Sequence, residues 1–174
     1  MATGTAAGST RRRRRRLAAE GAWLDLWRHG GQPVHVFRLA GIYGPGRSAI
    51  DQVRAGRARR IVKPGQFFSR IHVDDIVATL RASMARPDPG AIYNLADDLP
   101  AAPDAVIAHA ADLLGVPPPP EEPFDQVRST LSPMALSFYA DNRRIANERI
   151  KRALGVRLGH PTYREGLAAI AAST

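Results

Sequence analysis

A short apolar stretch that breaks into glycine and proline constrains this chain more than any other feature. Val34–Leu39 is largely apolar, and the segment Ala40–Arg47 that follows holds three glycines and one proline. Such a pattern predicts a buried strand that ends in a sharp loop. Strands buried on both faces belong to parallel sheets covered by helices, and ligands bind beyond the carboxyl ends of those strands. We therefore expect a binding site at Ala40–Arg47.

The rest of the chain alternates between strand and helix patterns, which predicts an α/β fold. A second strand is predicted at Ala91–Leu95, parallel to Val34–Leu39, with short extended pieces at Ile61–Val62 and Phe67–Val73. Helices are predicted over Leu17–Trp27, Ser48–Ala55, Asp74–Met84, Ala102–Leu114, Arg143–Leu154 and Thr162–Ala172, and a short one opens at Ser132-Pro133. Two clear parallel strands are few for such a sheet. Either another chain covers the bare edge, or the domain is incomplete.

The composition narrows the chemistry that this chain can carry. Its 174 residues leave room for one domain, and 44% hydrophobic and 24% charged residues are typical of a soluble globular chain. The absence of cysteine excludes disulfides, thiolate ligands and a thiol nucleophile. The five histidines are scattered without a pair at ligand spacing, so no metal site is predicted. No apolar run reaches the ~20 residues that span a membrane, and we expect a cytoplasmic protein.

The charge is concentrated at one end. Six of the nine net positive charges belong to Arg11–Arg16, which leaves +3 for the rest. We expect residues 1–16 to be a disordered Arg-rich tail, 17–115 to form the α/β domain, and 116–174 to form a Pro-rich connector and a helical region. The tail is typical of an organellar transit peptide or of an irregular start, and the second reading is favoured. The alternative function is a basic binding module in which Arg11–Arg16 binds nucleic acid or an anionic surface. Aromatic residues for base stacking are missing beside this tract, which disfavours nucleic acid.

Four motifs, in order, resemble the extended short-chain dehydrogenases, the NAD-dependent epimerase/dehydratase family. They are Arg38–Gly46 (RLAGIYGPG), Phe68–Ile76 (FSRIHVDDI), Ile92–Asp97 (IYNLAD), and the pair Asn142–Gly155 and Tyr163–Leu167. The resemblance covers about residues 17–172 and corresponds to the second half of such a protein. It implies a partial Rossmann-like doubly wound fold and an oxidoreductase that uses NAD or NADP.

The resemblance also shows what this chain lacks. A dinucleotide site needs a Gly-x-Gly-x-x-Gly turn after the first strand, and the sequence contains no such motif. By resemblance, Leu39, Ala40 and Gly41 lie against the nicotinamide. We expect weak NAD(P) binding, or none, by the chain alone.

The catalytic pair of the family is absent as well. Its tyrosine and the lysine four residues later correspond to Arg12 and Arg16, within a residue or so of register. Arginine does not give up its proton near neutral pH, so no catalytic residue is predicted. By resemblance, Arg16 can still hold a ribose hydroxyl. The chain alone is therefore expected to be inactive, as the atypical branch of the family is expected to lack the usual pair.

The resemblance indicates a substrate side with altered chemistry. Gly41 stands where family members that bind nucleotide-sugars often have asparagine, and Phe68 where they often have the arginine that serves the diphosphate. Arg70 and Arg47 can partly substitute, while Tyr43 lies next to the crevice and is expected to pack rather than react. A nucleotide-sugar is not the expected substrate, and the small molecule that binds stays open.

His72 with Asp74-Asp75 could be half of a metal site, but a capping arrangement between strand and helix is favoured. The partner expected to cover the open sheet edge is a nucleotide-binding half or a second copy of the chain.

Overall fold

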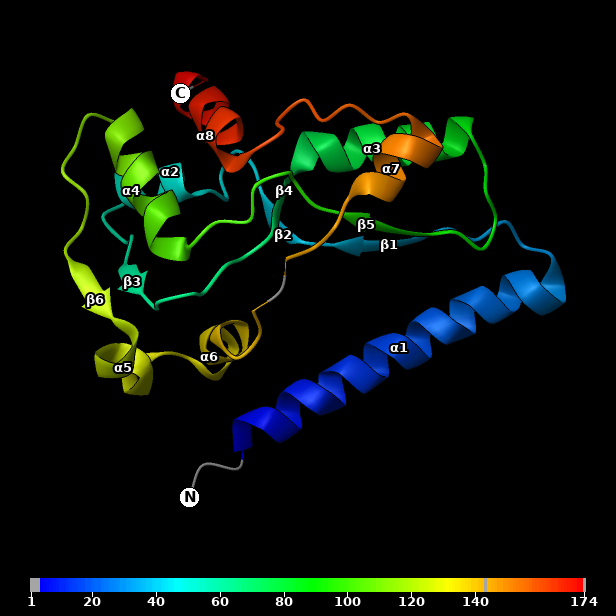
Figure 1. Ribbon diagram of the computed structural model, residues 1–174, viewed down its shortest axis with the longest axis horizontal. Coiled ribbons are helices and arrows are strands. Elements are labelled where there is room, and N and C mark those ends of the chain that lie inside the picture. Colours follow the sequence, from blue (N-terminus) through cyan, green and yellow to red (C-terminus); the bar gives the residue numbers. More distant parts are fainter. Residues whose placement is uncertain (1–3, 143, 174) are drawn as a thin grey trace.

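The computed structural model describes residues 4–142 and 144–173, with side chains from Arg14 onward. Its elements are α1 (Gly4–Gly30), β1 (Val36–Leu39), β2 (Gly41–Tyr43), α2 (Ala49–Arg54), β3 (Arg60–Val62), β4 (Arg70–His72), α3 (Val73–Ala85), β5 (Ile92–Leu95), α4 (Pro103–Leu113), β6 (Glu121–Pro123), α5 (Phe124–Val127), a 3₁₀ turn (Arg128–Thr130), α6 (Pro133–Tyr139), α7 (Glu148–Leu154) and α8 (Tyr163–Ala172). Figure 1 shows strands and helices intermixed along the chain.

The predicted strands pair as expected. β1 and β5 run parallel, with Val36 opposite Ile92 and Leu39 opposite Leu95. At Ala40 the chain changes partner, because the Ala40 N–H still donates to the Leu95 carbonyl whereas the Gly41 N–H donates to the Ser69 carbonyl. β2 then pairs in parallel with β4. The parallel α/β prediction is confirmed.

A third parallel pair was not predicted. β3 pairs with β6, and Glu121 and Glu122 of β6 lie opposite Arg60 and Ile61. The sequence indicated an extended connector here, since a Glu-Glu-Pro strand has no apolar alternation. Two ion pairs link β6 to the β3 region in place of apolar contacts: Arg59 binds Glu122, and Arg60 contacts Glu121 at 3.0 Å.

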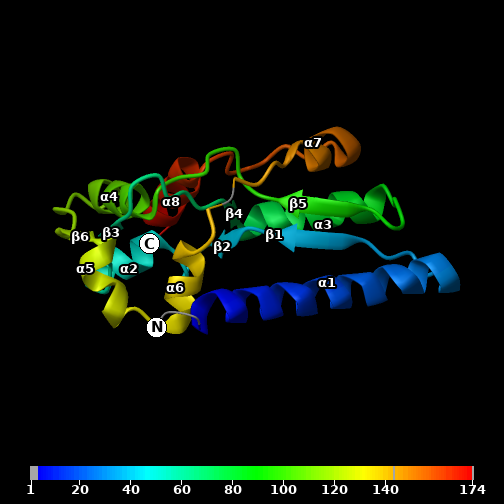
Figure 2. The same ribbon diagram turned by 60° about the horizontal axis from the view of Figure 1, so that its bottom comes forward.

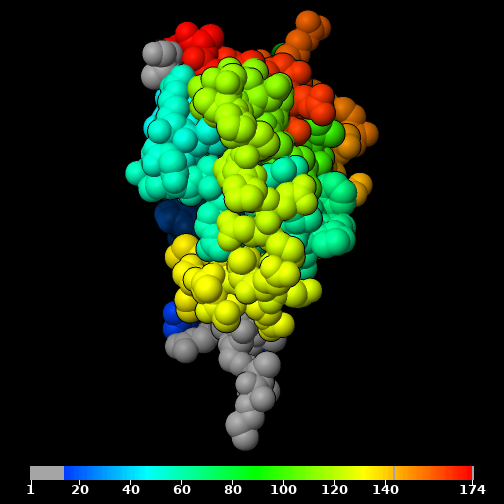
Figure 3. Space-filling view, turned by 90° about the vertical axis from the view of Figure 1, so that its left-hand side faces the viewer, coloured from blue at the N-terminus to red at the C-terminus, as the bar shows by residue number. Residues whose placement is uncertain are grey.

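Helices lie on both sides of the β1–β5 pair. Figures 1 and 2 show α1 along one side, with α3 and α7 on the other. One core cluster joins β4, β5 and α7, and a second joins α2, α4 and α8. Figure 3 shows the chain from α4 to β6 running over the α2–β3 region, with α5 and α6 beside it. Within the described residues, β1 has no strand on the side away from β5.

The first helix corrects one prediction. α1 begins at Gly4, so residues 4–16, predicted to be a disordered tail, continue the helix expected from Leu17; residues 1–3 lie outside the described residues. Alanine and arginine are good helix formers, whereas the tail prediction considered only the lack of side chains to bury. The side chains of Arg14–Arg16 are exposed.

One further boundary differs from its prediction. The helix predicted over Arg143–Leu154 begins at Glu148, because Asn147 turns inward and donates to the Ala96 carbonyl and the Asp98 carboxylate. Arg143 lies outside the described residues. Among the helices described, none combines the length and the apolar character that crossing a membrane would require.

Candidate functional site

A cavity of about 660 Å³ opens beyond the carboxyl end of the β1–β2 segment. Its walls come from β2, α2, β3, β4, α4, α6 and α8. Four residues of the predicted site segment, Gly41, Ile42, Tyr43 and Arg47, line it. The volume falls in the range of small-molecule sites, about 300–1,000 Å³. The predicted segment therefore lines a cavity at the end of a parallel strand, and its use as a binding site stays a prediction.

A tight turn carries Arg47 to the rim of this cavity. The N–H of Arg47 donates to the Gly44 carbonyl, and the N–H of Gly44 donates back. Gly46 has φ +75°, which favours glycine. At Gly44, a Cβ atom would lie 2.7 Å from Cγ1 of Val73, so the turn packs directly on α3. Ser48 and Asp51 then cap α2 reciprocally, which fixes the end of the turn.

Tyr43 faces the cavity but is held by the protein. Its side chain is buried, its hydroxyl donates to the Thr162 carbonyl at 3.4 Å, and its ring meets the His72 ring edge-on at 5.1 Å. Burial, with the nearby Asp97 and Asp75 carboxylates, raises the pKa of Tyr43 above its ordinary value. A general acid/base needs a pKa near the working pH. The geometry therefore agrees with a packing role for this residue.

Arg70 lies at the inner end of the cavity. Its Nη1 donates to the Phe68 carbonyl at 2.9 Å and to the Ala101 carbonyl at 3.0 Å. Burial lowers the pKa of Arg70 from its usual value, although the Asp97 charge opposes this. Phe68 and Arg70 both line the cavity, as expected for residues two apart on an extended strand.

Asp97 is a buried carboxyl that sequence reasoning missed. It is 1% exposed, just beyond β5, and its Oδ2 has no hydrogen-bond partner among the described residues. Burial raises its pKa to about 7, despite the Leu99 N–H that it accepts and the Arg70 charge. Its position directly after a predicted strand was the available signal, because polar residues there lie at the crevice edge.

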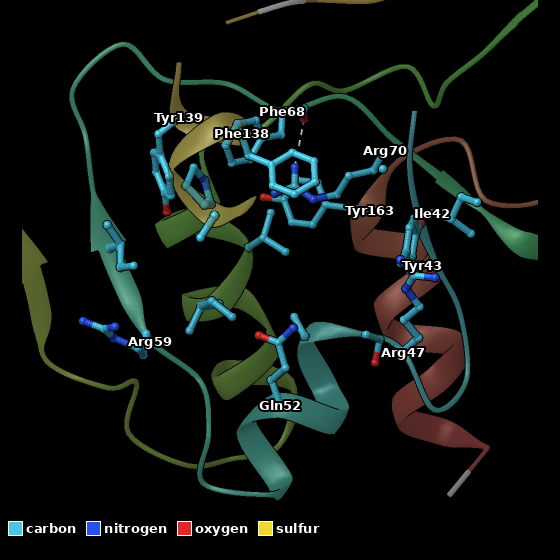
Figure 4. Close-up of a pocket in the computed structure, with 18 of the residues that line it drawn as sticks. Ile42, Tyr43, Arg47, Gln52, Arg59, Phe68, Arg70, Phe138, Tyr139 and Tyr163 are labelled. Atoms are coloured by element: carbon cyan, nitrogen blue, oxygen red, sulfur yellow. Dashed lines mark hydrogen bonds between the residues drawn. The ribbon is translucent and has the colours of Figure 1, made fainter. Parts of the chain in front are cut away.

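An aromatic wall closes the cavity opposite Tyr43, and it was not predicted either. Phe138 and Tyr139 belong to α6, and Phe68 meets Tyr139 edge-on at 5.6 Å. Figure 4 shows Phe68, Phe138 and Tyr139 together, with Arg47 and Tyr43 on the opposite side. The short α6 pattern gave no sign that this helix would fold back over the strand ends.

His72 and its neighbours form a cap. The His72 Nδ1 accepts the Asp74 N–H at 3.2 Å, which places the ring proton on Nε2. The buried Asp75 carboxylate accepts the N–H groups of Gly159 and His160 at 2.6 and 3.2 Å. The predicted capping of α3 is confirmed, and Asp75 also ties α3 to the segment before α8.

The fold brings His160 next to this cap. His72, Asp74 and His160 have possible ligand atoms within 4.8 Å of one another. A cation would have to displace the Asp74 N–H from the His72 Nδ1, because the other ring nitrogen carries the proton. Burial, followed by the neighbouring His160, lowers the pKa of His72 and keeps the ring neutral. The donor set fits a helix cap better than a cation site.

The residues predicted to meet a nicotinamide follow one another where the chain leaves the β1–β5 pair. Leu39 is 43% exposed, and the backbone N–H groups of Ala40 and Gly41 are both bonded within the sheet. Arg16 is exposed on α1, one turn before Glu20, which binds Arg38. Contact of these residues with a nicotinamide stays a prediction. No Gly-x-Gly-x-x-Gly turn is present to hold the pyrophosphate.

Comparisons with known proteins find relatives that match most of this chain. No family model matches the chain. It is 32% identical over 143 residues to a 3-diazoavenalumate denitrifying reductase from a Streptomyces species, covering 76% of this chain and 45% of that protein. It is 30% identical over 127 residues to protein YeeZ of Escherichia coli (strain K12), covering 72% and 43%.

Solved structures extend the likeness. A conserved protein of unknown function from Silicibacter pomeroyi is 60% identical, with a TM-score of 0.74, over 81% of this chain and 48% of that one. The human epimerase family protein SDR39U1, solved with NADPH, has a TM-score of 0.66 at 20% identity, over 80% and 48%. A dTDP-glucose 4,6-dehydratase from Bacillus anthracis, in complex with NAD, has a TM-score of 0.67 at 17% identity, over 88% and 48%. The last two show the fold alone.

The chain spans about half the length of these relatives. Its ordered motifs, its parallel strand pairs with a crevice at their ends, and its relatives all lead to the same assignment. The chain belongs to the NAD-dependent epimerase/dehydratase family of extended and atypical short-chain dehydrogenases/reductases, a family that uses a nicotinamide nucleotide, and it has a partial Rossmann-like fold.

Proposed function

We propose that this chain is the substrate-side portion of an NAD(P)-dependent oxidoreductase or epimerase, and that it does not transfer hydride by itself. The cavity at the carboxyl ends of the parallel strands supports this proposal, because a substrate bound there would lie next to Gly41. The reductase from Streptomyces, 32% identical, supports redox chemistry. By its name, that protein acts on 3-diazoavenalumate.

Inactivity of the isolated chain follows from two missing parts. Hydride transfer needs a bound nicotinamide, and the pyrophosphate has no glycine turn to bind here. Proton transfer needs a group whose pKa is near the working pH, and loss of one typically costs about 10²–10⁴-fold in rate. The pKa of Tyr43 is raised and its hydroxyl is bonded to the Thr162 carbonyl, so Tyr43 does not fill that role. Asp97, whose pKa is raised to about 7, does not line the cavity.

We further propose that a nucleotide-binding half docks on the free edge of β1. An unpaired strand edge is a template for another strand. Apolar side chains lie exposed on both flanking helices: Leu17, Trp23 and Leu26 on α1, and Val73, Val77, Leu80 and Met84 on α3. The α3 residues recur at helical spacing and form one stripe. Relatives that are about twice as long support the existence of such a half.

Titration with nucleotides tests the first proposal. Calorimetry of the full chain with NAD⁺, NADH, NADP⁺ and NADPH should give no saturable binding below about millimolar concentration, since the pyrophosphate contacts are missing. A dissociation constant in the low micromolar range would contradict it.

Reconstitution tests the second proposal. The part of the Silicibacter pomeroyi protein that this chain does not cover should form a complex with it on size exclusion. Leu39→Lys should prevent the complex, because a charge on the β1 edge opposes strand pairing, whereas Val116→Lys, an exposed apolar site after α4, should not. Self-association of the chain alone, blocked by Leu39→Lys, would indicate a homodimer instead.

A further inference from the structure

The cavity described above has two chemically different sides. One side carries Arg47, whose side chain has no partner among the described residues, and the other is the aromatic wall. We propose that this cavity binds an aromatic carboxylic acid, with the carboxylate at Arg47 and Arg70 and the ring against Phe68, Phe138 and Tyr139. The inference deepens the proposed function by naming the substrate class of the same site.

Two arginines, Arg47 and Arg70, give the cavity a positive charge. The guanidinium group of Arg47 makes no hydrogen bond or ion pair with any residue that the structure describes, and it lines the rim. Arg70 uses Nη1 for two main-chain carbonyls and forms no ion pair within the same described residues. The Asp97 carboxyl acts on Arg70 electrostatically but forms no ion pair with it among the described residues, so the remaining N–H donors of Arg70 can meet an anionic ligand. Arg59 is different, since Glu122 already neutralises it.

Aromatic rings form the opposite wall of the cavity. Phe138 is 59% exposed although it lines the cavity, so its ring is available to a ligand. Phe68 and Tyr139 stand edge-on at 5.6 Å, and Phe124 packs behind Tyr139 at 4.8 Å. Aromatic rings prefer partners at such offset or edge-on distances. Figure 4 shows this wall across the cavity from Arg47.

The side chains around the cavity are poorly suited to bind the hydroxyl groups of a sugar. A sugar needs polar side chains that can bind its hydroxyl groups. The hydroxyls around this cavity are largely used by the protein: Ser48 bonds Asp51, Ser137 bonds the Met134 carbonyl, and Tyr43 bonds the Thr162 carbonyl. A site of this kind recognises a ring face and one anion better than a nucleotide-sugar.

Calorimetric titration of the full chain tests this with three probes: 4-hydroxycinnamate, its neutral amide, and dTDP-glucose. The acid should bind more tightly than the amide by a factor of about ten or more, which is the difference in affinity expected for a charge-assisted hydrogen bond. The acid should also bind more tightly than dTDP-glucose. No binding of the acid, equal binding of the amide, or preference for dTDP-glucose would each overturn the proposal.

Paired variants assign the two ends of the ligand. Arg47→Gln should weaken the acid about tenfold and leave the amide unchanged, while Arg81→Gln, an exposed arginine on α3, should change neither. Phe138→Ala should weaken both about three- to tenfold, and Met134→Ala, exposed on the same helix, should weaken neither. An unchanged acid affinity in Arg47→Gln would overturn the assignment. The titrations need neither nucleotide nor a second half, so their outcome is separate from that of the proposed function.

Discussion

Two regions of this molecule differ in how completely they are packed. Between α2, α4 and α8 the core is closed: Ile50 and Leu167 are buried on all sides and packed against apolar neighbours. Along α1 and β1 the layers stay open, with Trp23 59% exposed and Leu39 at the strand end. One region buries its apolar surface within the chain, whereas the other presents it outward. Under the function proposed above, the closed region is the substrate side, and the open region is the one that faces the nucleotide-binding half.

The largest effect should come from the closed core. Ile50→Ala removes a fully buried side chain and should lower the free energy of unfolding by about 2–5 kcal/mol. The matched change on the open side, Leu26→Ala, removes a side chain that is 45% exposed and should cost within about 0.5 kcal/mol. Urea denaturation measures both, and similar costs for the two would remove the contrast.

The next effect concerns pH. Because burial raises the pKa of Asp97 to about 7 from an ordinary 3.8, the folded state binds its proton more tightly than the unfolded state does. Stability should therefore fall as the pH rises from about 4 to about 7, by up to about 1.4 kcal/mol per pH unit. Asp97→Asn mimics the neutral form and should raise the melting temperature at pH 8 but not at pH 4.

An exposed carboxylate serves as the control for that experiment. Asp112→Asn, on the surface of α4, should leave the pH dependence unchanged. If Asp97→Asn gave the same shift at pH 4 and pH 8, ionisation of Asp97 would not be the cause.

A smaller effect is expected at the contact between α8 and β2. A Cβ atom at Gly166 would lie 2.1 Å from the Tyr43 hydroxyl and 2.8 Å from its ring. Gly166→Ala should therefore lower stability by about 1–3 kcal/mol, as overpacking does, although alanine favours helices by about 1 kcal/mol. Ala168 is exposed on the same helix, so Ala168→Gly measures the contribution of helix propensity alone. A stabilised Gly166→Ala protein would contradict this packing.

The smallest effect is expected from α1. Removal of residues 1–16 should shift the melting temperature little, because Arg14–Arg16 are exposed and exposed positions usually change stability by within about 0.5 kcal/mol. A drop of several degrees would show that this half of the helix supports the fold. The same truncation tests the basic-module alternative, since salt-dependent RNA or DNA binding that it abolishes would support that role.

Local signals predicted much of this fold. The strand before Ala40, the capping serine Ser48 and the acidic start of α3 follow from residue chemistry within a few positions. β6 and the inward position of α6 depend on contacts with residues far along the chain, so local patterns could not reveal them. The position of Asp97 after a predicted strand was a local signal, but its raised pKa could not be predicted, because it depends on burial that the tertiary fold creates.

The three strand pairs have a consequence for how the chain acquires its structure. Each pair is parallel, and in the described part of the chain no two strands adjacent in sequence pair as a hairpin. β1 must await β5 beyond α3, and β3 must await β6 beyond α4. Such non-local pairing slows folding, because the entropy cost of closing a long loop comes before the strand contacts that offset it. During synthesis on the ribosome, β1 therefore emerges long before its partner strand and stays unpaired until β5 has been made.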